Sequence, residues 1–181
     1  NVILHLMPED LNPTSKIQSY EIPTLDISRD YGEISYFNEV GSFDFKTSDS
    51  FALISTSEMA RLNGSRDADY IDISRGINNV YTMNGDDVIF ITGGESFIKS
   101  GYGFDKVIVD LNSLKENRGS IQWADFNYGA DSLVLNSFDF EEPLILTTTE
   151  DFVKVTDVLD EASIEINKGS DIRSTKLPPL G

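Results

Sequence analysis

The stretch that decides the fold lies between residues 85 and 107, where three similar units follow one another. It contains Gly85-Asp86-Asp87-Val88-Ile89, then Gly94-Glu95-Ser96-Phe97-Ile98, then Gly103-Phe104-Asp105-Lys106-Val107. Each unit has a glycine, a polar or acidic residue two positions later, and a β-branched residue two positions after that. The unit recurs every nine residues, and a short fixed period of this kind is typical of a solenoid.

The same spacing extends toward the N-terminus and gives five copies in one register. The β-branched positions are Ile71, Val80, Ile89, Ile98 and Val107, the polar positions are Asp69, Asn78, Asp87, Ser96 and Asp105, and the first positions are Asp67, Gly76, Gly85, Gly94 and Gly103. In a solenoid the β-branched residue points inward, and the glycine permits the positive φ of a tight loop. Leu53 and Leu62 continue the apolar spacing backwards and predict lead-in coils.

Side chains two positions apart share one face of a strand, so the repeat predicts further core residues. These are Ile73, Ile91 and Val109, with Thr82 and Ser100 lining the rim of the core. The opposite face of the same strands is too apolar for water, since it carries Tyr70, Val88, Phe90 and Ile108. We expect strands from 31–55 or 120–145 to cover that face.

The repeat resembles the calcium-binding nonapeptide of the repeats-in-toxin family, Gly-Gly-x-Gly-x-Asp-x-U-x, in which U is a large apolar residue. The most similar copy is Gly101-Tyr102-Gly103-Phe104-Asp105-Lys106-Val107. The resemblance implies a parallel β-roll in which two units make one turn, and a secreted bacterial toxin, protease, lipase or adhesin as the parent protein. Loops eighteen residues apart would then stack on the same edge of the roll.

On that arrangement, one edge of the roll keeps its acids and the other has lost them. Asp69, Asp87 and Asp105 would stack on the first edge, and Asn78 and Ser96 on the second. We expect calcium on the Asp edge at about two sites, because carboxylate and carbonyl oxygens are its preferred ligands.

The candidate calcium ligands are the paired acids Asp69 with Asp87 and Asp87 with Asp105, completed by carbonyl oxygens of Gly85 and Gly103. Asp67 replaces a glycine at the first site and is a further candidate. The alternative is a metal-free roll in which neutral side chains and hydrogen bonds replace the ions, as Asn78 and Ser96 already suggest.

The whole chain reads as all-β: a short parallel β-roll or β-solenoid with flanking β-strands packed on it. The predicted parts are an irregular N-terminal segment (1–30), lead-in β-strands (31–62), the β-roll (63–110), a C-terminal β flank (111–167) and a linker (168–181). Within these, residues 56–62 suggest one helical turn and residues 111–119 a loop or short helix. A sixth copy at 128–133 breaks the register, because Asp131 follows Asp105 by 26 residues, and an ordinary turn explains it equally well.

The charge balance limits the possible partners. The chain carries 31 Asp and Glu against 14 Lys and Arg, a net charge of −17. Nucleic acid and anionic membrane surfaces need basic contacts, whereas a cation suits an acidic chain. The chain has no cysteine, which excludes disulfides and thiolate metal sites, and no apolar run long enough for a transmembrane helix. Both ends of the sequence suggest a piece of a longer polypeptide.

Catalytic signals are weak, and we expect a protein that is not an enzyme. The single histidine, His5, has no obvious partners for a catalytic triad. A polysaccharide-active β-helix would need an acid pair, for which the candidates are Asp125, Asp131, Glu141 and Glu142. Trp123 with Phe126 and Tyr128 could form a platform for sugars, although core packing is the more common role of such a cluster.

The sequence therefore predicts a calcium-binding folding module of a secreted bacterial toxin or adhesin. In this hypothesis its partners are calcium and neighbouring domains, with a host-cell receptor or glycan as a further possibility. The alternatives are a metal-free scaffold or binding module and a polysaccharide-active β-helix.

Overall fold

The fold is a two-sheet parallel β-solenoid, as the repeat predicts. The computed structural model describes residues 2–4, 18–19, 31, 34–44, 49–127, 129–136, 145–156 and 161–167. In order across the sheet, sheet A contains β2 (Gln18–Ser19), β1 (Val2–Leu4), β13 (Ser132–Asn136), β11 (Lys106–Asp110), β9 (Val88–Ile91), β7 (Tyr70–Ile73), β5 (Ala52–Ser55) and β3 (Ile34–Phe37). Sheet B contains β14 (Ile145–Thr148), β15 (Phe152–Thr156), β16 (Ser163–Asn167), β12 (Ser120–Trp123), β10 (Glu95–Lys99), β8 (Ile77–Tyr81), β6 (Met59–Asn63) and β4 (Gly41–Asp44).

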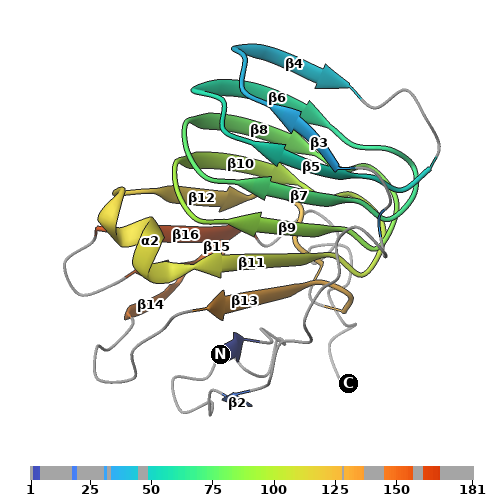
Figure 1. The fold of residues 1–181 in the computed structure, drawn as a ribbon. Helices are drawn as coiled ribbons and strands as arrows, with labels where there is room; N and C mark the ends of the chain where they lie inside the picture. The colour runs from blue at the N-terminus through green and yellow to red at the C-terminus, as the bar shows by residue number, and fades with distance from the viewer. Residues whose placement is uncertain are drawn as a thin grey trace, which may run out of the picture.

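The chain alternates between the two sheets, so each coil contributes one strand to each (Figure 1). Neighbouring strands from β3 to β13 in sheet A, and from β4 to β16 in sheet B, pair in parallel. The register matches the repeat, since Ile71 lies opposite Ile89 and Ile89 opposite Val107. The strands predicted to flank the roll therefore belong to the same two sheets as the repeat.

The inward side chains of both sheets form one continuous core. The repeat positions are fully buried: Ile71, Val80, Ile89, Ile98 and Val107, together with Ile73, Ile91 and Val109. Leu53 and Leu62 are buried with them, and Thr82 and Ser100 are buried beside them. All of these predictions are confirmed. Such β-branched side chains suit a short pleated strand that packs on both sides.

Residues 56–62, predicted as a helical turn, instead lead into strand β6. Ala60 and Leu62 point into the core while Met59 and Arg61 are exposed, an alternation with the period of a strand. The helix propensity of this segment is outweighed by pairing with β4 and β8 on either side.

A short helix, α2 (Leu111–Glu116), interrupts the coils between β11 and β12. Asp110 caps it by accepting a hydrogen bond from the Ser113 N–H at 3.0 Å. Leu111 and Leu114 anchor it to the core. Because the helix is accommodated at a corner, β12 still pairs in register with β10. Within the described residues, no helix has the length and apolarity needed to cross a membrane.

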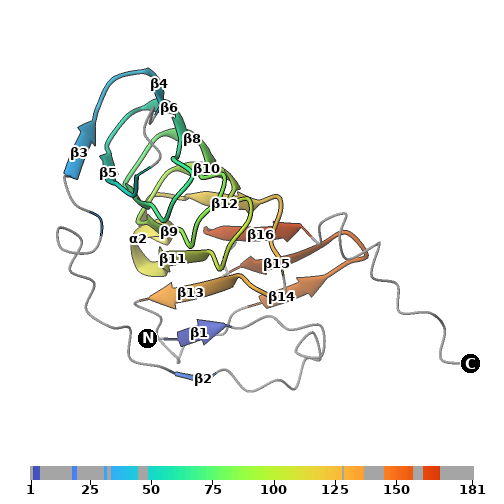
Figure 2. The same ribbon diagram turned by 90° about the vertical axis from the view of Figure 1, so that its right-hand side faces the viewer.

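The end of the solenoid opposite β3 and β4 changes from parallel to antiparallel pairing (Figure 2). β1 pairs antiparallel with β13, β15 pairs antiparallel with β16, and β14 pairs antiparallel with β15. Val153 and Val155 of β15 extend the core at this end.

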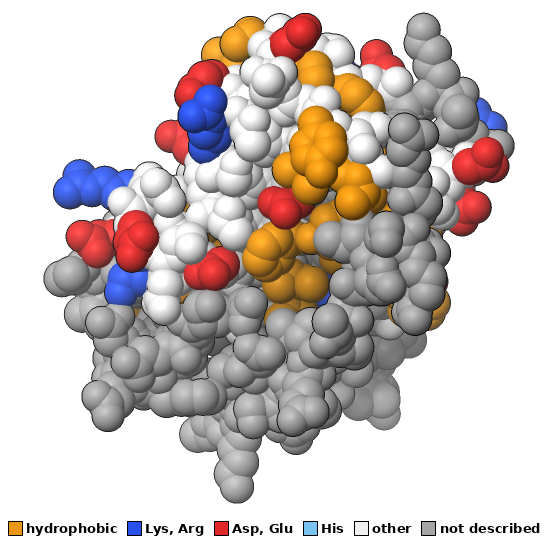
Figure 3. All heavy atoms as spheres, viewed as in Figure 1, with side chains coloured by type: hydrophobic (Ala, Val, Ile, Leu, Met, Phe, Trp, Pro, Cys, Tyr) orange, Lys and Arg blue, Asp and Glu red, His pale blue; other side chains and the backbone are white. Residues whose placement is uncertain are grey.

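The outer face of sheet A carries a second apolar cluster, as the sequence predicts. Its members are Ala52, Tyr70, Val88, Ile108 and Val134, and Tyr31, Ile34 and Phe90 pack against them. Tyr31 and Ile34 come from the lead-in segment, and Val134 from the C-terminal flank. The expectation that strands from 31–55 or 120–145 cover this face is wrong for the described strands, because they extend sheets A and B instead of lying over them. Figure 3 shows that apolar side chains also gather at the surface over this sheet.

Candidate functional site

The candidate site is the edge of the solenoid formed by loops 64–69, 82–87, 100–105 and 124–131, called here the acid edge. Each loop leads from sheet B into sheet A, and each ends in an aspartate that precedes a strand. The four residues are Asp69, Asp87, Asp105 and Asp131, called here the Asp ladder. All four are buried, with at most 4% of their surface exposed.

Hydrogen bonds connect the ladder from one coil to the next. Oδ1 of Asp87 accepts from the backbone N–H of Asp69 at 2.8 Å, and Oδ1 of Asp105 accepts from the N–H of Asp87 at 3.0 Å. Oδ1 of Asp131 accepts from the N–H of Asp105 at 3.1 Å. Each carboxyl group therefore satisfies a backbone donor of the coil before it, which confirms the predicted stacking of Asp69, Asp87 and Asp105.

The second carboxyl oxygens of two ladder residues differ from the first. Oδ2 of Asp87 and Oδ2 of Asp105 are buried, and no described residue donates to them with full hydrogen-bond geometry. The nearby hydroxyls of Thr82 and Ser100 favour the ionised forms of Asp87 and Asp105, and they offset only part of the effect of burial on each pKa. By contrast, Oδ2 of Asp69 accepts from the Ser65 N–H at 2.7 Å, and Oδ2 of Asp131 accepts from the Asn127 N–H at 2.8 Å. A buried carboxylate oxygen without a donor is costly, so the centre of the ladder favours a proton or a cation.

The pKa values of the ladder agree with this geometry. Burial, with a smaller contribution from the charges of Asp105 and Asp69, raises the pKa of Asp87 to about 8 despite hydrogen bonds that favour ionisation. Burial likewise raises the pKa of Asp69 to about 6, that of Asp105 to about 6 and that of Asp131 to about 7. At neutral pH the ladder therefore combines protonated and ionised carboxyl groups in one buried column.

The glycines predicted as carbonyl ligands lie where neighbouring loops stack closely. Gly85 has φ of +125° and Gly103 has φ of +151°. A Cβ on Gly103 would overlap the carbonyl oxygen of Gly85, and a Cβ on Gly85 would lie 2.5 Å from the carbonyl carbon of Asp67. Only glycine fits these positions, and the Gly85 carbonyl faces the next coil.

Asp67 lies outside the ladder. Its side chain is exposed and accepts a hydrogen bond from the Ala68 N–H at 2.9 Å. It occupies the position of the repeat glycine without a positive φ. Its charge contributes to the raised pKa of Asp69, after the larger effect of burial.

The donor chemistry of the acid edge suits calcium in one respect. Asp87 and Asp105 present buried oxygens, unpaired within the described residues, on neighbouring coils. The parts of the chain that the structure describes contain no group of three or more His, Cys, Asp or Glu side chains placed to hold a metal. Calcium takes about 6–8 oxygens, so backbone carbonyls would supply most of its ligands.

The sequence left the role of Asp131 open and did not predict that of Asp125. Asp131 extends the ladder to a fourth coil, so the segment at 128–133 continues the acid edge. Asp125 accepts from the N–H groups of Ser100 and Gly101 at 2.9 and 3.0 Å, and so joins its own loop to the loop 100–105. Asp125 and Asp131, two of the four candidate acids for catalysis, thus both accept from backbone N–H groups. The other candidates, Glu141, Glu142 and His5, lie outside the described residues.

Trp123 belongs to the core and is fully buried. Its ring packs edge-on against Phe126 at 4.8 Å between centroids, and its Nε1–H donates to Ser100 Oγ at 3.1 Å. This confirms core packing as its role, and the ring is not available as a surface platform. Tyr128 lies outside the described residues.

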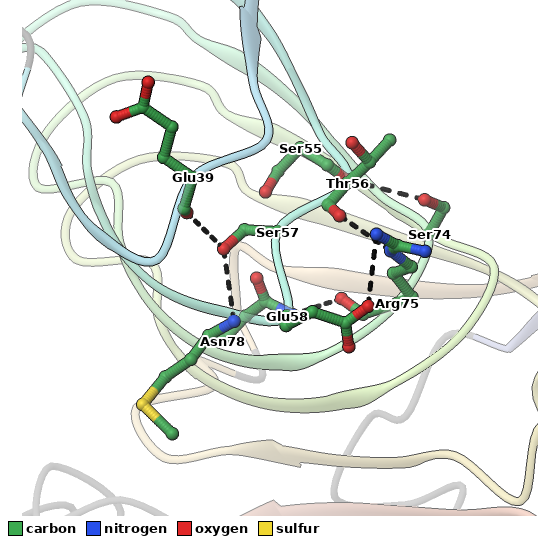
Figure 4. A network of polar contacts seen from close by, with 9 residues as sticks. Glu39, Ser55, Thr56, Ser57, Glu58, Ser74, Arg75 and Asn78 are labelled. Carbon is green, nitrogen blue, oxygen red and sulfur yellow. Dashed lines mark hydrogen bonds and ion pairs between the residues drawn. The ribbon is translucent and has the colours of Figure 1, made fainter.

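The opposite edge, called here the neutral edge, consists of loops 56–58, 74–76 and 92–94 with the Asn78 and Ser96 side chains that follow them. Asn78 and Ser96 stack in register, as predicted. Asn78 Nδ2 donates to the Arg75 carbonyl at 2.9 Å, and Arg75 Nε donates to the Thr56 carbonyl at 2.7 Å. Figure 4 shows this network, which joins successive loops without any buried acid.

Comparison of the chain with protein-family models, with curated proteins and with solved structures gave no match.

Proposed function

We propose that this chain is a structural module of a larger secreted bacterial protein, and that calcium binding at the Asp ladder drives its folding outside the cell. The observation that carries the proposal is the buried column of four carboxyl groups, two of which have an oxygen with no donor among the described residues. A buried column of this kind is stable only when its charge is neutralised.

Electrostatic repulsion explains why the metal would act as a folding switch. Neighbouring ladder residues lie on adjacent coils, and parallel strands are about 4.8 Å apart. Ionised carboxylates at that spacing in a buried site repel one another strongly. Calcium near Asp87 and Asp105 would remove this repulsion and supply positive charge to oxygens that lack a donor. The binding free energy then becomes folding free energy.

The difference in calcium concentration between the cytosol and the outside of the cell suits a module that folds after export. Extracellular calcium modules commonly have Kd values of ~10⁻⁴–10⁻³ M. In a calcium-poor cytosol the acid edge would stay loose, and in millimolar calcium the filled sites would stabilise the fold by mass action. The acidic composition of the chain, with a net charge of −17, keeps the unfolded form soluble in the meantime.

A metal-free scaffold is the second candidate, and the completed hydrogen-bond ladder favours it. Oδ1 of each ladder residue from Asp87 to Asp131 already binds a backbone donor without any ion. In this case protons on Oδ2 would neutralise the centre of the ladder, and the module would fold whether or not calcium is present.

Calcium titration into chelator-treated protein at pH 7.5, with circular dichroism recorded alongside, separates the two candidates. The first predicts saturable binding of about two ions with a gain in β-signal. Asp87→Asn should abolish binding at the centre of the ladder. Glu58→Gln is the matched control, because it removes one exposed carboxylate on the neutral edge. No binding, with the full β-signal already present, would establish the metal-free scaffold instead.

A further inference from the structure

The outer face of sheet B has a groove beside the neutral edge, and Asn78 and Ser96 of that edge belong to its lining. The groove has a volume of about 340 Å³ and crosses strands β8, β10, β12 and β16. It lies on the solvent side of the sheet, whereas the ladder residues are buried at the acid edge. A ligand here would therefore bind independently of calcium, and the inference goes beyond the proposed function.

The register of the strands explains the shape of the groove. One row of outward side chains runs Ile77, Glu95, Ser120 and Ser163 across the four strands. The first two side chains are large and exposed, and the serines are small. The surface is therefore lower over β12 and β16 than over β8 and β10.

The adjacent row supplies the chemistry of the groove. Asn79, Phe97, Gln122 and Glu165 lie side by side in register. Gln122 Nε2 donates to Glu165 Oε1 at 3.4 Å, which orients both groups. Phe97 is half-buried, and its ring lies 6.5 Å from that of Tyr81. The row thus offers an apolar ring between two amides, which donate and accept hydrogen bonds, with a carboxylate beyond them that accepts.

This combination suits a chain of sugar units. Small-molecule sites are typically concave, with apolar surface and a few placed polar groups, and this groove lies at the lower end of their size range of ~300–1,000 Å³. Amide and carboxylate groups bind paired hydroxyls, and an aromatic ring covers the apolar face of a sugar. Side chains in a row recur every ~4.8 Å across the sheet, a spacing comparable with the length of one pyranose unit.

The charge of the groove selects among sugars. Glu95 and Glu165 line it, and the chain as a whole carries −17. Arg61 is held over the Tyr81 ring at 4.8 Å from its centroid and donates to Asn63, outside the groove. Uronates and sulfated sugars would therefore be repelled.

We infer that the outer face of sheet B binds an uncharged oligosaccharide along this groove, with Phe97 as the stacking residue and Gln122, Asn79 and Glu165 as the groups that bind hydroxyls. The glycan lies across the strands, so that successive sugar units meet successive coils. Specificity for uncharged sugars comes from the two glutamates.

The test is a printed array of neutral and anionic glycans, followed by calorimetry with the best neutral tetrasaccharide, in chelator and again in calcium. We expect neutral glycans to bind and anionic ones to fail. Phe97→Ala should weaken binding by about tenfold or more, the scale of a lost aromatic contact. Gln122→Ala, at an exposed position that leaves the core intact, should weaken it by about fivefold.

Lys99→Ala is the matched control, because Lys99 is exposed on the same strand as Phe97 but does not line the groove. Its affinity should equal that of the unmodified chain. Absence of binding to every neutral glycan, preference for anionic glycans, or equal affinity in the Gln122→Ala variant would overturn the inference. None of these outcomes would affect the calcium proposal, which is read from ion binding alone.

Discussion

The two edges of the solenoid hold their stacked loops together with different polar groups. Both turn the chain between sheets in stacked loops, and both use glycines with positive φ, such as Gly94 and Gly103. On the acid edge, buried carboxyl groups accept from backbone N–H groups of the coil before. On the neutral edge, Asn78 and Arg75 donate to backbone carbonyls, and the charged groups stay exposed.

The difference shows that a metal or a buried acid is not needed to stack these loops. The neutral edge holds its register with amides, hydroxyls and one exposed ion pair. The acid edge holds the same register with groups whose charge depends on the solution. One edge therefore provides constant stability, and the other makes stability depend on pH and on cations.

The largest expected loss of stability comes from replacing a loop glycine, and it should be similar on the two edges. Gly103→Ala forces a Cβ into the Gly85 carbonyl, and Gly94→Ala places one against the Gly76 carbonyl. Each variant should lose ~3 kcal/mol or more of unfolding free energy, measured by urea denaturation. Gly129→Ala is the control, because its Cβ would meet only Asn127 Oδ1 at 3.5 Å. A small loss in Gly103→Ala would show that the loops do not stack closely.

The next largest effect is a dependence of the unfolding free energy on pH, which distinguishes the acid edge from the neutral edge. The ladder pKa values are raised in the folded state, so between about pH 4 and pH 8 the unfolded chain loses protons that the folded chain keeps. Stability is therefore full below the unfolded pKa and falls as pH rises. In chelator, the unfolding free energy should drop by ~3 kcal/mol or more from pH 5 to pH 8. Stability that rises over this range would contradict a buried, uncompensated ladder.

A single substitution should sharpen that result. Asp87→Asn keeps an oxygen to accept from the Asp69 N–H and removes the group with the highest ladder pKa. Its stability at pH 8 in chelator should equal or exceed that of the unmodified chain, and the pH dependence should weaken by ~1–3 kcal/mol. Urea denaturation at both pH values measures this. Asp87→Asn leaves the repulsion among surface acids unchanged. If its pH dependence were identical to that of the unmodified chain, the pH dependence would have to arise outside the ladder.

The smallest effect is expected on the neutral edge. Arg75→Ala removes the hydrogen bond to Thr56 and the ion pair with Glu58. The side chains of Arg75 and Glu58 are 58% and 68% exposed. The loss should be about 0.5–1 kcal/mol, as for exposed pairs, and independent of pH from 5 to 8. Thermal denaturation at the two pH values provides the comparison. A pH-dependent loss would show that the neutral edge also contains a titrating group.

The nine-residue spacing predicted the register, the core and the stacking of Asp69, Asp87 and Asp105, because each depends only on period and side-chain type. It left Asp131 undecided because helix α2 lengthens one coil, so that Asp131 follows Asp105 by 26 residues rather than 18. The helix cap at Asp110 and Ser113 was the available signal. The groove on sheet B lay beyond sequence reasoning, since it depends on which outward side chains meet across four strands.

The hydrogen bonds of the Asp ladder all point the same way along the solenoid axis. Among the described residues, the backbone N–H of Asp69 donates to Asp87, that of Asp87 to Asp105, and that of Asp105 to Asp131. Backbone hydrogen bonds also run in the opposite sense, since the N–H of Val88 donates to the Asp69 carbonyl and that of Lys106 to the Asp87 carbonyl. Each coil on this edge therefore depends on both of its neighbours, and the loss of one coil would leave unpaired backbone donors on the coil before it and on the coil after it.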